Sequence, residues 1–460
     1  MKNYIKLTTV ALIALGVVSC DNLLEPTVDY AVPTSTAITS AADMASVING
    51  AHDLANGAGT FGEDAIGTPE VMSDNAFANT NSGRYATQSL FTIVTTNGYP
   101  SAIWSGAYAV IAQANIVINS GLSGGEADHY LGQAYSIRAF MHFFLLKNFG
   151  QQYVDGGDAS LGIPIVTTYA DGNLFPARDS YSAVLSAIEQ DFDQAMSLLD
   201  PAKETTNLIS YYSTAGFMSR FFNFSGNYSR AIAAADIVIN SGLYSIVPAE
   251  NVVPIWQSTT SPGAMKELVF TSTDRNAFEN LARMMRNTNY GDIEVTKDLY
   301  DSYSDTDVRK ELLVEDPVGR YRMVHKFNLE DGTDAIPMLR YAEVWLNKAE
   351  ALAKSGQNAQ ALEMIQTLSS ARNATNNYTS GSALEVLEER RLELALEGHR
   401  FYDLARHGLD IRNVPIPSII AGNRFNNNTG DIEFGDFRYA FPIPQNEMDS
   451  NPQMVQNKGY

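Results

Sequence analysis

Apolar residues recur every three or four positions through most of the chain, a spacing that gathers side chains on one face of an α-helix. The segment 340–354 shows the pattern best, and its apolar face comprises Tyr341, Ala342, Trp345, Leu346, Ala349, Leu352 and Ala353. Similar spacing predicts further helices at about 41–56, 101–120, 126–148, 179–199, 211–224, 228–241, 295–303, 358–371 and 383–405. A short strand is expected at 267–271. The pattern therefore predicts a mainly helical chain.

Two pairs of short segments repeat, and each contains a glycine turn. Residues 114–122 (ANIVINSGL) and 235–243 (ADIVINSGL) differ at one position, and both indicate a helix that ends at glycine with the next leucine folded back. In the second pair, 225–231 and 355–361, a glycine turn precedes a helix that carries an alanine. A glycine turn followed by a small residue allows two helices to pack closely. We therefore predict an all-α scaffold of tetratricopeptide-like helical hairpins.

Long stretches separate these predicted hairpins. The segments at about 57–100, 150–178 and 245–335 are rich in Gly, Asn, Thr and Pro. Loops of this length in a compact chain usually carry function. The scaffold is therefore expected to bear large irregular insertions with a few short strands.

The N-terminus has the pattern of an export signal. Lys2 and Lys6 precede an apolar run at 7–18, which is too short to span a bilayer. Small residues then lead to Cys20, the single cysteine of the chain. This pattern predicts cleavage before Cys20 and acylation of the cysteine, and more than one acyl chain gives lasting membrane anchorage. The alternative is an ordinary secretory signal followed by a chance cysteine.

The predicted export signal also defines the domain organisation. We predict a signal peptide at 1–19, a lipidated polar tether at 20–36 and a single domain at 37–460. The N-terminal part of that domain extends to about 245, and the C-terminal part begins at about 246. No stretch after the signal peptide is expected to span a membrane, so the mature protein should be tethered.

Composition excludes several classes of protein. The 460 residues include 31 Lys and Arg against 52 Asp and Glu, which gives a net charge of −21. Nucleic-acid binding needs a basic face, and this balance argues against it. A hydrophobic content of 45% with 18% charged residues is typical of a folded protein. A single cysteine excludes a disulfide within the chain and a cysteine-based metal site.

Signatures of catalysis and of cofactor binding are missing from the sequence. It contains no Gly-x-Ser-x-Gly elbow, no P-loop and no dinucleotide fingerprint, and its six histidines include no i,i+4 pair. A pair of catalytic carboxylates is recognised by its separation in space, so the sequence does not exclude such a pair. Glu63 and Asp64 are the candidates, but we expect them to be surface charges. The oxygen-rich segment 426–436 favours a polar turn over a calcium site. We therefore expect that the protein is not an enzyme and that it binds neither a cofactor nor a metal.

Charged residues are densest between 388 and 406. Opposite charges lie three residues apart in the pairs Glu388/Arg391, Arg390/Glu393 and Glu397/Arg400, which are neighbours on a helix. One interpretation is a solvated, ion-paired helix face. The other is a partly buried Arg–carboxylate network that locks the C-terminal half to the hairpins. We favour a structural network over a catalytic role.

Several blocks, taken in order, resemble one known family. In the C-terminal half they are 338–351 (MLRYAEVWLNKAEA), 389–394 (ERRLEL), 397–406 (EGHRFYDLAR), 441–444 (FPIP), Glu447, 451–452 (NP) and 456–460 (QNKGY). In the N-terminal half they are 104–115, 132–140 (GQAYSIRAF), 149–150 (FG) and 162–165 (GIPI). Gly132-Gln133 departs from the usual Gly-Glu pair. The chain resembles the SusD/RagB family of nutrient-binding outer-membrane lipoproteins over essentially its whole mature length.

The resemblance implies a fold and a function. The fold would be a tetratricopeptide-type helical scaffold with a loop-rich face. The protein would sit on the cell surface, tethered to the outer membrane, as a lid over a SusC-like TonB-dependent transporter. It would capture an oligosaccharide for import, without covalent chemistry. Capture of peptides, or a role mainly as the lid of the transporter, is the alternative, and a hydrolase is a third.

The resemblance also directs attention to two insertions, 57–100 and 245–335, from which members of this family build ligand sites. Sugars are held by aromatic faces and planar hydrogen-bonding side chains. The predicted ligand-binding residues are Asp74, Asn75, Arg84, Tyr85, Trp256 and Tyr290. The alternative for each is a packing role in its loop. Trp104, on an apolar helix face, is expected to belong to the core.

Overall fold

The computed structural model describes residues 38–460 except 80, 158, 170–174, 287–289 and 415–429. The predicted signal peptide, the tether with Cys20 and the first part of the segment 426–436 lie outside the described residues. Residues Ser40–Tyr460 form one compact unit.

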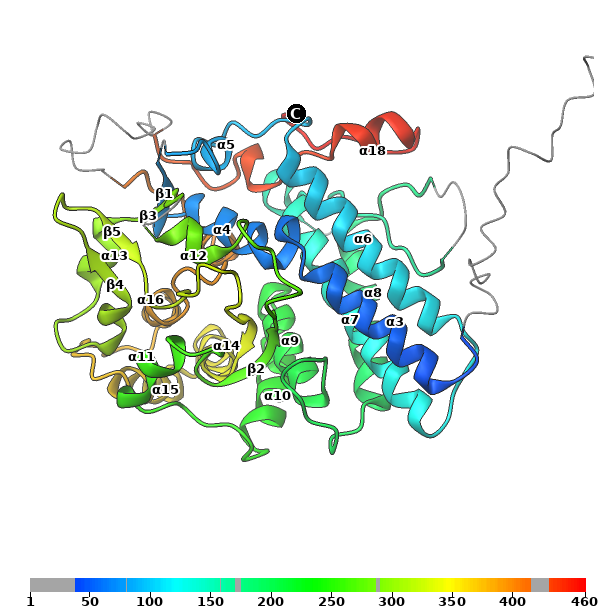
Figure 1. Ribbon diagram of the computed structural model, residues 1–460, viewed down its shortest axis with the longest axis horizontal. Helices are drawn as coiled ribbons and strands as arrows, with labels where there is room; N and C mark the ends of the chain where they lie inside the picture. The colour runs from blue at the N-terminus through cyan, green and yellow to red at the C-terminus, as the bar shows by residue number, and fades with distance from the viewer. Residues whose placement is uncertain (1–37, 80, 158, 170–174, 287–289, 415–429) are drawn as a thin grey trace, which may run out of the picture. The chain divides into compact units, whose positions relative to one another are not determined.

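Among the residues that the structure describes, eight long helices form the scaffold of this unit. They are α3 (Ala41–Ala55), α6 (Gly98–Ile118), α7 (Glu126–Phe149), α8 (Tyr181–Leu198), α9 (Tyr211–Phe224), α10 (Tyr228–Ile239), α14 (Tyr341–Lys354) and α15 (Asn358–Ser370). Helices consecutive in the chain pack against each other, α6 on α7, α7 on α8, α9 on α10 and α14 on α15 (Figure 1). The predicted all-α scaffold of helical hairpins is confirmed.

Shorter elements fill the insertions and the C-terminal part. The helices are α4 (Asp64–Val71), α5 (Ala86–Ser89), α11 (Ala249–Trp256), α12 (Leu281–Met285), α13 (Lys297–Ser302), α16 (Ala383–Glu393), α17 (Arg400–Arg406) and α18 (Gln445–Ser450). The strands β1 (Ala76–Ala78), β3 (Ile293–Val295), β5 (Tyr321–Met323) and β4 (Leu313–Glu315) form an antiparallel sheet in that order. A second antiparallel pair joins β2 (Ala264–Leu268) to β6 (Ile336–Arg340). The insertions are therefore more ordered than the sequence predicts.

The glycine turns have the expected geometry. Gly226 and Gly356 adopt φ angles of 76° and 78°, a left-handed conformation that glycine tolerates without steric cost. The alanines that follow, Ala231 and Ala361, are completely buried where each helix meets its partner. Leu243 does not fold back as predicted, because its side chain is 57% exposed.

Helix α14 places its predicted face in the core. Ala342, Leu346, Ala349 and Leu352 form one buried cluster with residues of α15, and Trp345 packs at its edge. Apolar burial of this kind provides the main stabilisation of each hairpin.

The helix predicted at 383–405 is broken into α16 and α17. Between them, Leu396 and Gly398 have positive φ angles of 62° and 82°, which a helix cannot continue through. Gly398 also lies against α4, since a Cβ atom there would approach the backbone of Ala65 and Ile66 to 3.0 Å. The strand predicted at 267–271 starts earlier, at Ala264. Both corrections reflect contacts with distant segments.

Helix α6 is long and apolar enough to cross a membrane by length and composition, which the sequence analysis did not anticipate. Its apolar residues Ile103, Ala107, Val110, Ile111 and Ala114 are buried. Helix α6 packs against both α3 and α7. These contacts identify α6 as a core helix of the scaffold.

A buried charge network joins the C-terminal part, as favoured from the sequence. The Glu393 carboxylate accepts hydrogen bonds from Arg309, Arg340 and Arg372 at 3.2, 3.1 and 2.9 Å. Each of these side chains is at most 3% exposed. Glu397 accepts from Lys326 at 2.6 Å and from Arg340 at 2.7 Å. The network is confirmed.

The pairs within that network differ from those predicted. Arg391 bonds Asp298 instead of Glu388, Arg390 bonds Asp403, and Arg400 bonds Asp74. The break between α16 and α17 separates Glu397 from Arg400, whereas on α16 Arg390 and Arg391 bond carboxylates of other segments instead of their neighbours on the helix. The pairs instead link segments that are distant in the sequence.

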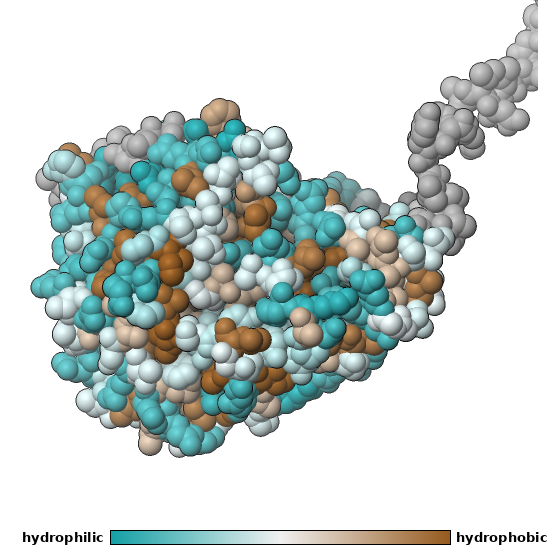
Figure 2. Space-filling view, turned by 60° about the horizontal axis from the view of Figure 1, so that its bottom comes forward, coloured by the Kyte–Doolittle hydropathy of each residue, from teal (hydrophilic) through white to brown (hydrophobic). Residues whose placement is uncertain are grey.

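Exposed apolar side chains are scattered over the surface. Large ones occur on separate segments, among them Leu243, Val269, Val318 and Leu384. Figure 2 shows one face on which hydrophobic residues lie in small groups between hydrophilic ones. The apolar surface of this face is therefore divided into several small areas.

Candidate functional site

The two insertions meet at the edge of the small sheet, where β1 pairs with β3. The register places Ala76 opposite Val295 and Ala78 opposite Ile293. Beyond β1, the Asn79 side chain donates to the Gly291 carbonyl at 2.6 Å and to the Glu294 carboxylate at 2.8 Å. This pairing fixes the loop after β1 beside the segment before β3.

Arg84 and Tyr290 come together on this support. The Arg84 guanidinium carbon lies 3.9 Å from the centre of the Tyr290 ring. The guanidinium also donates two hydrogen bonds to Glu279, at 3.2 and 2.6 Å, and one to the Ser82 hydroxyl at 3.1 Å. The Arg84 and Glu279 side chains are 31% and 45% exposed. The result is an accessible surface of a cation, an aromatic ring and a carboxylate.

An exposed aromatic ring that the sequence analysis missed adjoins this group. Phe278 is 60% exposed and precedes Glu279, and the guanidinium carbon of Arg283 lies 4.5 Å from the centre of its ring. Ala277 before it has a φ of 48°, a left-handed conformation that is uncommon for residues with a side chain. In the sequence, Phe278 could have been recognised as an aromatic residue between Ala277 and Glu279 inside a polar loop. We refer to Arg84, Phe278, Glu279 and Tyr290 as the insertion surface.

The side chains of Asp74 and Asn75 are buried in the protein. The Asp74 carboxylate accepts hydrogen bonds from Arg400 at 2.7 and 2.9 Å and from Arg412 at 3.2 Å. These guanidinium groups hold the pKa of Asp74 well below its usual range, against the opposing effect of burial. The Asn75 amide accepts from Arg391 at 2.8 Å and donates to Glu70 at 3.0 Å. Both side chains tie the N-terminal insertion to the C-terminal part.

Tyr85 is also buried, although it follows Arg84. Its hydroxyl donates to the Glu63 carboxylate at 2.7 Å. Its ring packs on Gly67, where a Cβ atom would lie 2.7 Å from the Tyr85 oxygen. Glu63 is buried rather than a surface charge as predicted. Burial, with the neighbouring Asp64, raises the pKa of Glu63 to about 8.

Trp256 is buried between charged and aromatic partners. The centre of its ring lies 5.9 Å from that of Phe327, 4.9 Å from the Lys326 amine and 5.3 Å from the Arg340 guanidinium carbon. Trp104 is buried as predicted.

The structure therefore brings Arg84 and Tyr290 together at an accessible position, while Asp74, Asn75, Tyr85 and Trp256 have partners within the fold. A ligand-binding role for each of the six stays a prediction.

The pH dependence of stability tests whether the buried Glu63 carboxyl group is protonated in the folded protein. Because its pKa is raised in the folded protein, the folded state binds more protons than the unfolded state between about pH 4.5 and 8. Stability should fall as pH rises through this window, by up to about 1.4 kcal/mol per pH unit. We expect Glu63→Gln to make the slope shallower by about 1 kcal/mol per pH unit in urea unfolding at pH 5 to 8. An unchanged slope of stability against pH would show that Glu63 is ionised in the folded protein. The control is Glu363→Gln, since Glu363 lies on the exposed face of α15.

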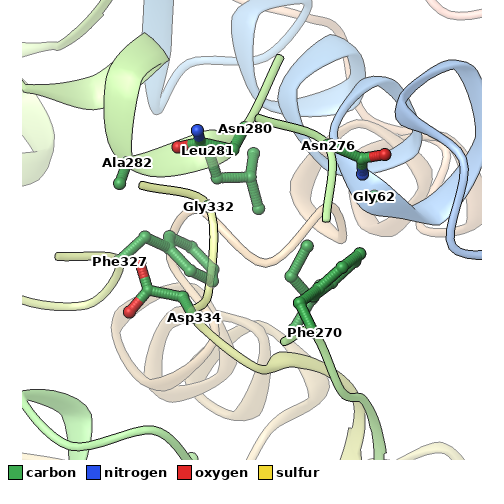
Figure 3. Close-up of a pocket in the computed structure, with 10 residues that line it drawn as sticks. Gly62, Phe270, Asn276, Asn280, Leu281, Ala282, Phe327, Gly332 and Asp334 are labelled. Atoms are coloured by element: carbon green, nitrogen blue, oxygen red, sulfur yellow. The ribbon is translucent and has the colours of Figure 1, made fainter. Parts of the chain in front are cut away.

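One cavity near the insertion surface is too small for a ligand. This cavity, into which Leu281, Phe270 and Phe327 point, has a volume of about 10 Å³ (Figure 3). This space suffices for about one water molecule. Two larger hollows lie elsewhere, one of about 400 Å³ beside Tyr378 and Glu388 and one of about 300 Å³ beside Trp104. Among the described residues, no group of three or more His, Cys, Asp and Glu is placed to hold a metal.

Two family models match separate parts of this chain. Residues 321–460 match the SusD family, and residues 23–222 match a family described as starch-binding associating with outer membrane. SusD-type domains are therefore present in both parts of the chain.

One curated relative spans the whole chain, and another matches a part of it. SusD-like protein P2 of Formosa agariphila is 26% identical over the full length of both chains. The starch-binding protein SusD of Bacteroides thetaiotaomicron is 31% identical over 125 residues, which cover 27% of this chain and 21% of that protein.

Solved structures share the SusD fold. A SusD superfamily protein of Bacteroides thetaiotaomicron superimposes with a TM-score of 0.82 at 26% identity and covers 91% of this chain and 100% of its own. Surface glycan-binding protein A of Bacteroides fluxus has a TM-score of 0.72 at 17% identity, with 92% and 100% covered. At that identity the second match indicates the fold only.

Proposed function

We propose that this SusD-like protein captures oligosaccharides at the cell surface and passes them to a SusC-like TonB-dependent transporter. Cys20 carries the lipid anchor in the outer membrane, and the protein does no covalent chemistry on its ligand. The description of the family matched by residues 23–222 as starch-binding and outer-membrane-associated supports the ligand class and the location. The predicted lipoprotein signal supports the anchor.

The observation that carries the proposal is the contact of Arg84 with Tyr290. Two insertions that are about 200 residues apart are hydrogen-bonded into one accessible surface, and Asn81 of the first donates to the Tyr290 carbonyl of the second at 2.6 Å. A pyranose ring presents an apolar face of C–H groups, which an aromatic ring can cover, and a rim of hydroxyl groups. Arg84 and Glu279 would meet those hydroxyl groups as donor and acceptor.

The tryptophans favour a second candidate function. Trp104 and Trp256 are buried, and the Trp345 indole donates to the Met364 carbonyl at 2.9 Å beside the α14 core. No tryptophan therefore forms part of the insertion surface, although tryptophan is a strong stacking platform. Peptide capture, or a role mainly as the lid of the transporter, is the alternative that this observation supports.

Affinity electrophoresis of the chain without residues 1–20 tests the proposal. Gels would contain soluble starch, xylan, mixed-linkage β-glucan or galactomannan. We expect one glycan to retard the protein and Tyr290→Ala to weaken that binding about tenfold, which corresponds to a lost contact of about 1.4 kcal/mol.

Tyr130→Ala is the matched control, because Tyr130 also lies under a cation, with Lys203 at 5.9 Å from its ring centre. Equal weakening by both variants would contradict the assigned surface. No retardation by any glycan would favour the alternative, and co-purification with a transporter from outer membranes would then test the lid.

A further inference from the structure

A small polar cavity lies where α7, α9, α14, α16 and α17 meet. Its volume is about 30 Å³, which is space for about two water molecules. Most of the side chains that line it are charged or polar, and they include Lys147, Arg220, Asn223, Arg390, Asp403 and Arg406. We refer to this space as the Lys147 cavity, and it shares no lining residue with the insertion surface.

The Lys147 amine has no hydrogen bond and no ion pair with any residue that the structure describes. Its nitrogen lies 4.0 Å from the centre of the Tyr402 ring, and the side chain is partly accessible. Burial lowers the pKa of Lys147 to about 7, and the charge of Arg220 adds to this effect against the opposing carboxylates of Glu343 and Asp403. A large share of the amine is therefore neutral at neutral pH, and a neutral amine has the lone pair of a nucleophile.

Two further polar atoms of the lining lack a partner among the described residues. Asn223 donates through Nδ2 to the Asn347 carbonyl at 2.8 Å, while its Oδ1 is buried and accepts no hydrogen bond. Arg220 donates through Nε and Nη2 to Glu343 at 2.5 and 2.6 Å, and its Nη1 is left without an acceptor. A buried polar atom without a partner costs free energy. The cavity thus offers a free acceptor and a free cationic donor as well as the amine.

Charge on the wall of the Lys147 cavity is mainly positive. Among the described residues that line it there is one carboxylate, that of Asp403, against three guanidinium groups, those of Arg220, Arg390 and Arg406. The carboxylates of Glu343 and Glu350 pair with two of these groups without lining the cavity. Burial holds the pKa of His399 well below its usual range, so this lining imidazole adds no charge. Such a wall disfavours an ammonium ion at Lys147 and favours a small anionic group.

We infer that Lys147 is a modification site at which carbon dioxide adds to the amine and forms a carbamate. The nitrogen lone pair attacks the carbon atom, the N–C bond forms, and one C=O electron pair moves to oxygen. A proton then leaves the nitrogen for water, so one amine and one carbon dioxide molecule give one carbamate anion and one proton. The three added heavy atoms fit a space for about two water molecules. Carbon dioxide is small and uncharged, so it can reach an amine that is only partly accessible.

The carbamate satisfies both unpartnered atoms of the lining. Its N–H group donates to Asn223 Oδ1, and its oxygen atoms accept from Arg220 Nη1. An ammonium group at Lys147 has three donors, and the free acceptor of Asn223 can take only part of them. The modified side chain links α7 to α9, so carbon dioxide should stabilise the fold. This role is independent of the proposed function.

Chemical trapping tests the inference in the chain without residues 1–20. The protein is equilibrated with isotope-labelled bicarbonate at neutral pH and treated with triethyloxonium, which converts a carbamate into a stable ethyl carbamate. Peptide mass spectrometry then locates the label. We expect it on Lys147 and not on Lys266. Lys266 is the matched control, because burial also lowers its pKa to about 7, but its amine donates to the Asn207 and Glu267 carbonyls at 2.9 and 2.7 Å.

Two variants test the geometry. Asn223→Leu should lower the labelling of Lys147 about fivefold, the equivalent of a hydrogen bond of about 1 kcal/mol. Bicarbonate should raise the unfolding temperature of the wild type above that in an equal concentration of chloride, and Lys147→Arg should remove this difference.

Three results would overturn the inference. Absence of label from Lys147 would exclude the carbamate. Equal labelling of Lys147 and Lys266 would show that a lowered pKa alone decides the reaction and that the cavity plays no part. Equal stabilisation of the wild type by chloride and bicarbonate would mean that the cavity holds an anion without a covalent bond. Thermal unfolding checks that each variant is folded, and the comparison of Lys147 with Lys266 needs no variant.

Discussion

Replacing Glu393 by glutamine is expected to lower the free energy of unfolding by about 3–5 kcal/mol. Its carboxylate contacts three guanidinium groups, those of Arg309, Arg340 and Arg372, from three different segments of the chain. These cations hold the pKa of Glu393 well below its usual range although burial opposes them. Glutamine keeps the size of the side chain but removes the negative charge, which leaves buried cations with too few counter-charges.

Urea unfolding at pH 7, followed by circular dichroism, measures this loss. The matched control is Glu363→Gln, because Glu363 lies on the exposed face of α15 and should change stability by no more than about 0.5 kcal/mol. A loss below about 1 kcal/mol for Glu393→Gln would mean that the remaining carboxylates, Glu389 and Glu397, neutralise the cluster without it.

Asp74→Asn is expected to destabilise the protein by a similar amount, about 3–5 kcal/mol, at neutral pH. The Asp74 carboxylate pairs with Arg400 and Arg412, and lies 3.9 Å from Arg391. The bond to Arg400 spans 326 residues of sequence. Its loss would therefore loosen the attachment of the N-terminal insertion to the C-terminal part.

The same carboxylate sets an acid dependence of opposite sign to that of Glu63. The folded-state pKa of Asp74 is lowered, so its contribution is complete above the unfolded value of about 3.9 and is lost as pH falls through the lower folded value. The wild type should lose stability below about pH 4, and Asp74→Asn should lose less over the same range. Equal acid slopes for the two proteins would contradict the pairing.

Asp74→Asn also tests the predicted ligand role of Asp74. A structural role predicts that weaker glycan retention accompanies lower stability. Weaker retention at unchanged stability would instead place Asp74 at the ligand. The same comparison applies to Tyr85→Ala and Trp256→Ala, since both rings are buried.

The helical scaffold was largely predictable because its signals are local. The spacing of apolar residues placed α9 at Tyr211–Phe224, as predicted, and α3 and α15 within one residue of their ends. The turns at Gly226 and Gly356 were predictable because a left-handed residue between helices favours glycine. Prediction failed at 383–405, where the break at Leu396 and Gly398 depends on the approach of α4.

The candidate site was predictable only in part. The insertions that form it were recognised from their length, their composition and the family resemblance, and Arg84 and Tyr290 were among the residues named. Phe278 was missed, because one apolar ring in a polar loop gives no periodic signal. Asp74 and Asn75 have the residue types of a loop, and nothing near them in the sequence indicates that Arg391 of α16 and Arg400 of α17 bond them.

Local sequence thus determined the helices and their turns, and the resemblance pointed to the SusD-type domains that the family models match. The export signal stays a prediction. Tertiary structure decided which charged residues are buried and which aromatic rings are exposed. The physical reason is that periodicity and turn chemistry act over a few residues, whereas burial depends on what the rest of the chain brings to a side chain. Arg84 and Tyr85 are neighbours in the sequence, yet one lies on an accessible surface beside Tyr290 and the other is buried against Gly67 and Glu63.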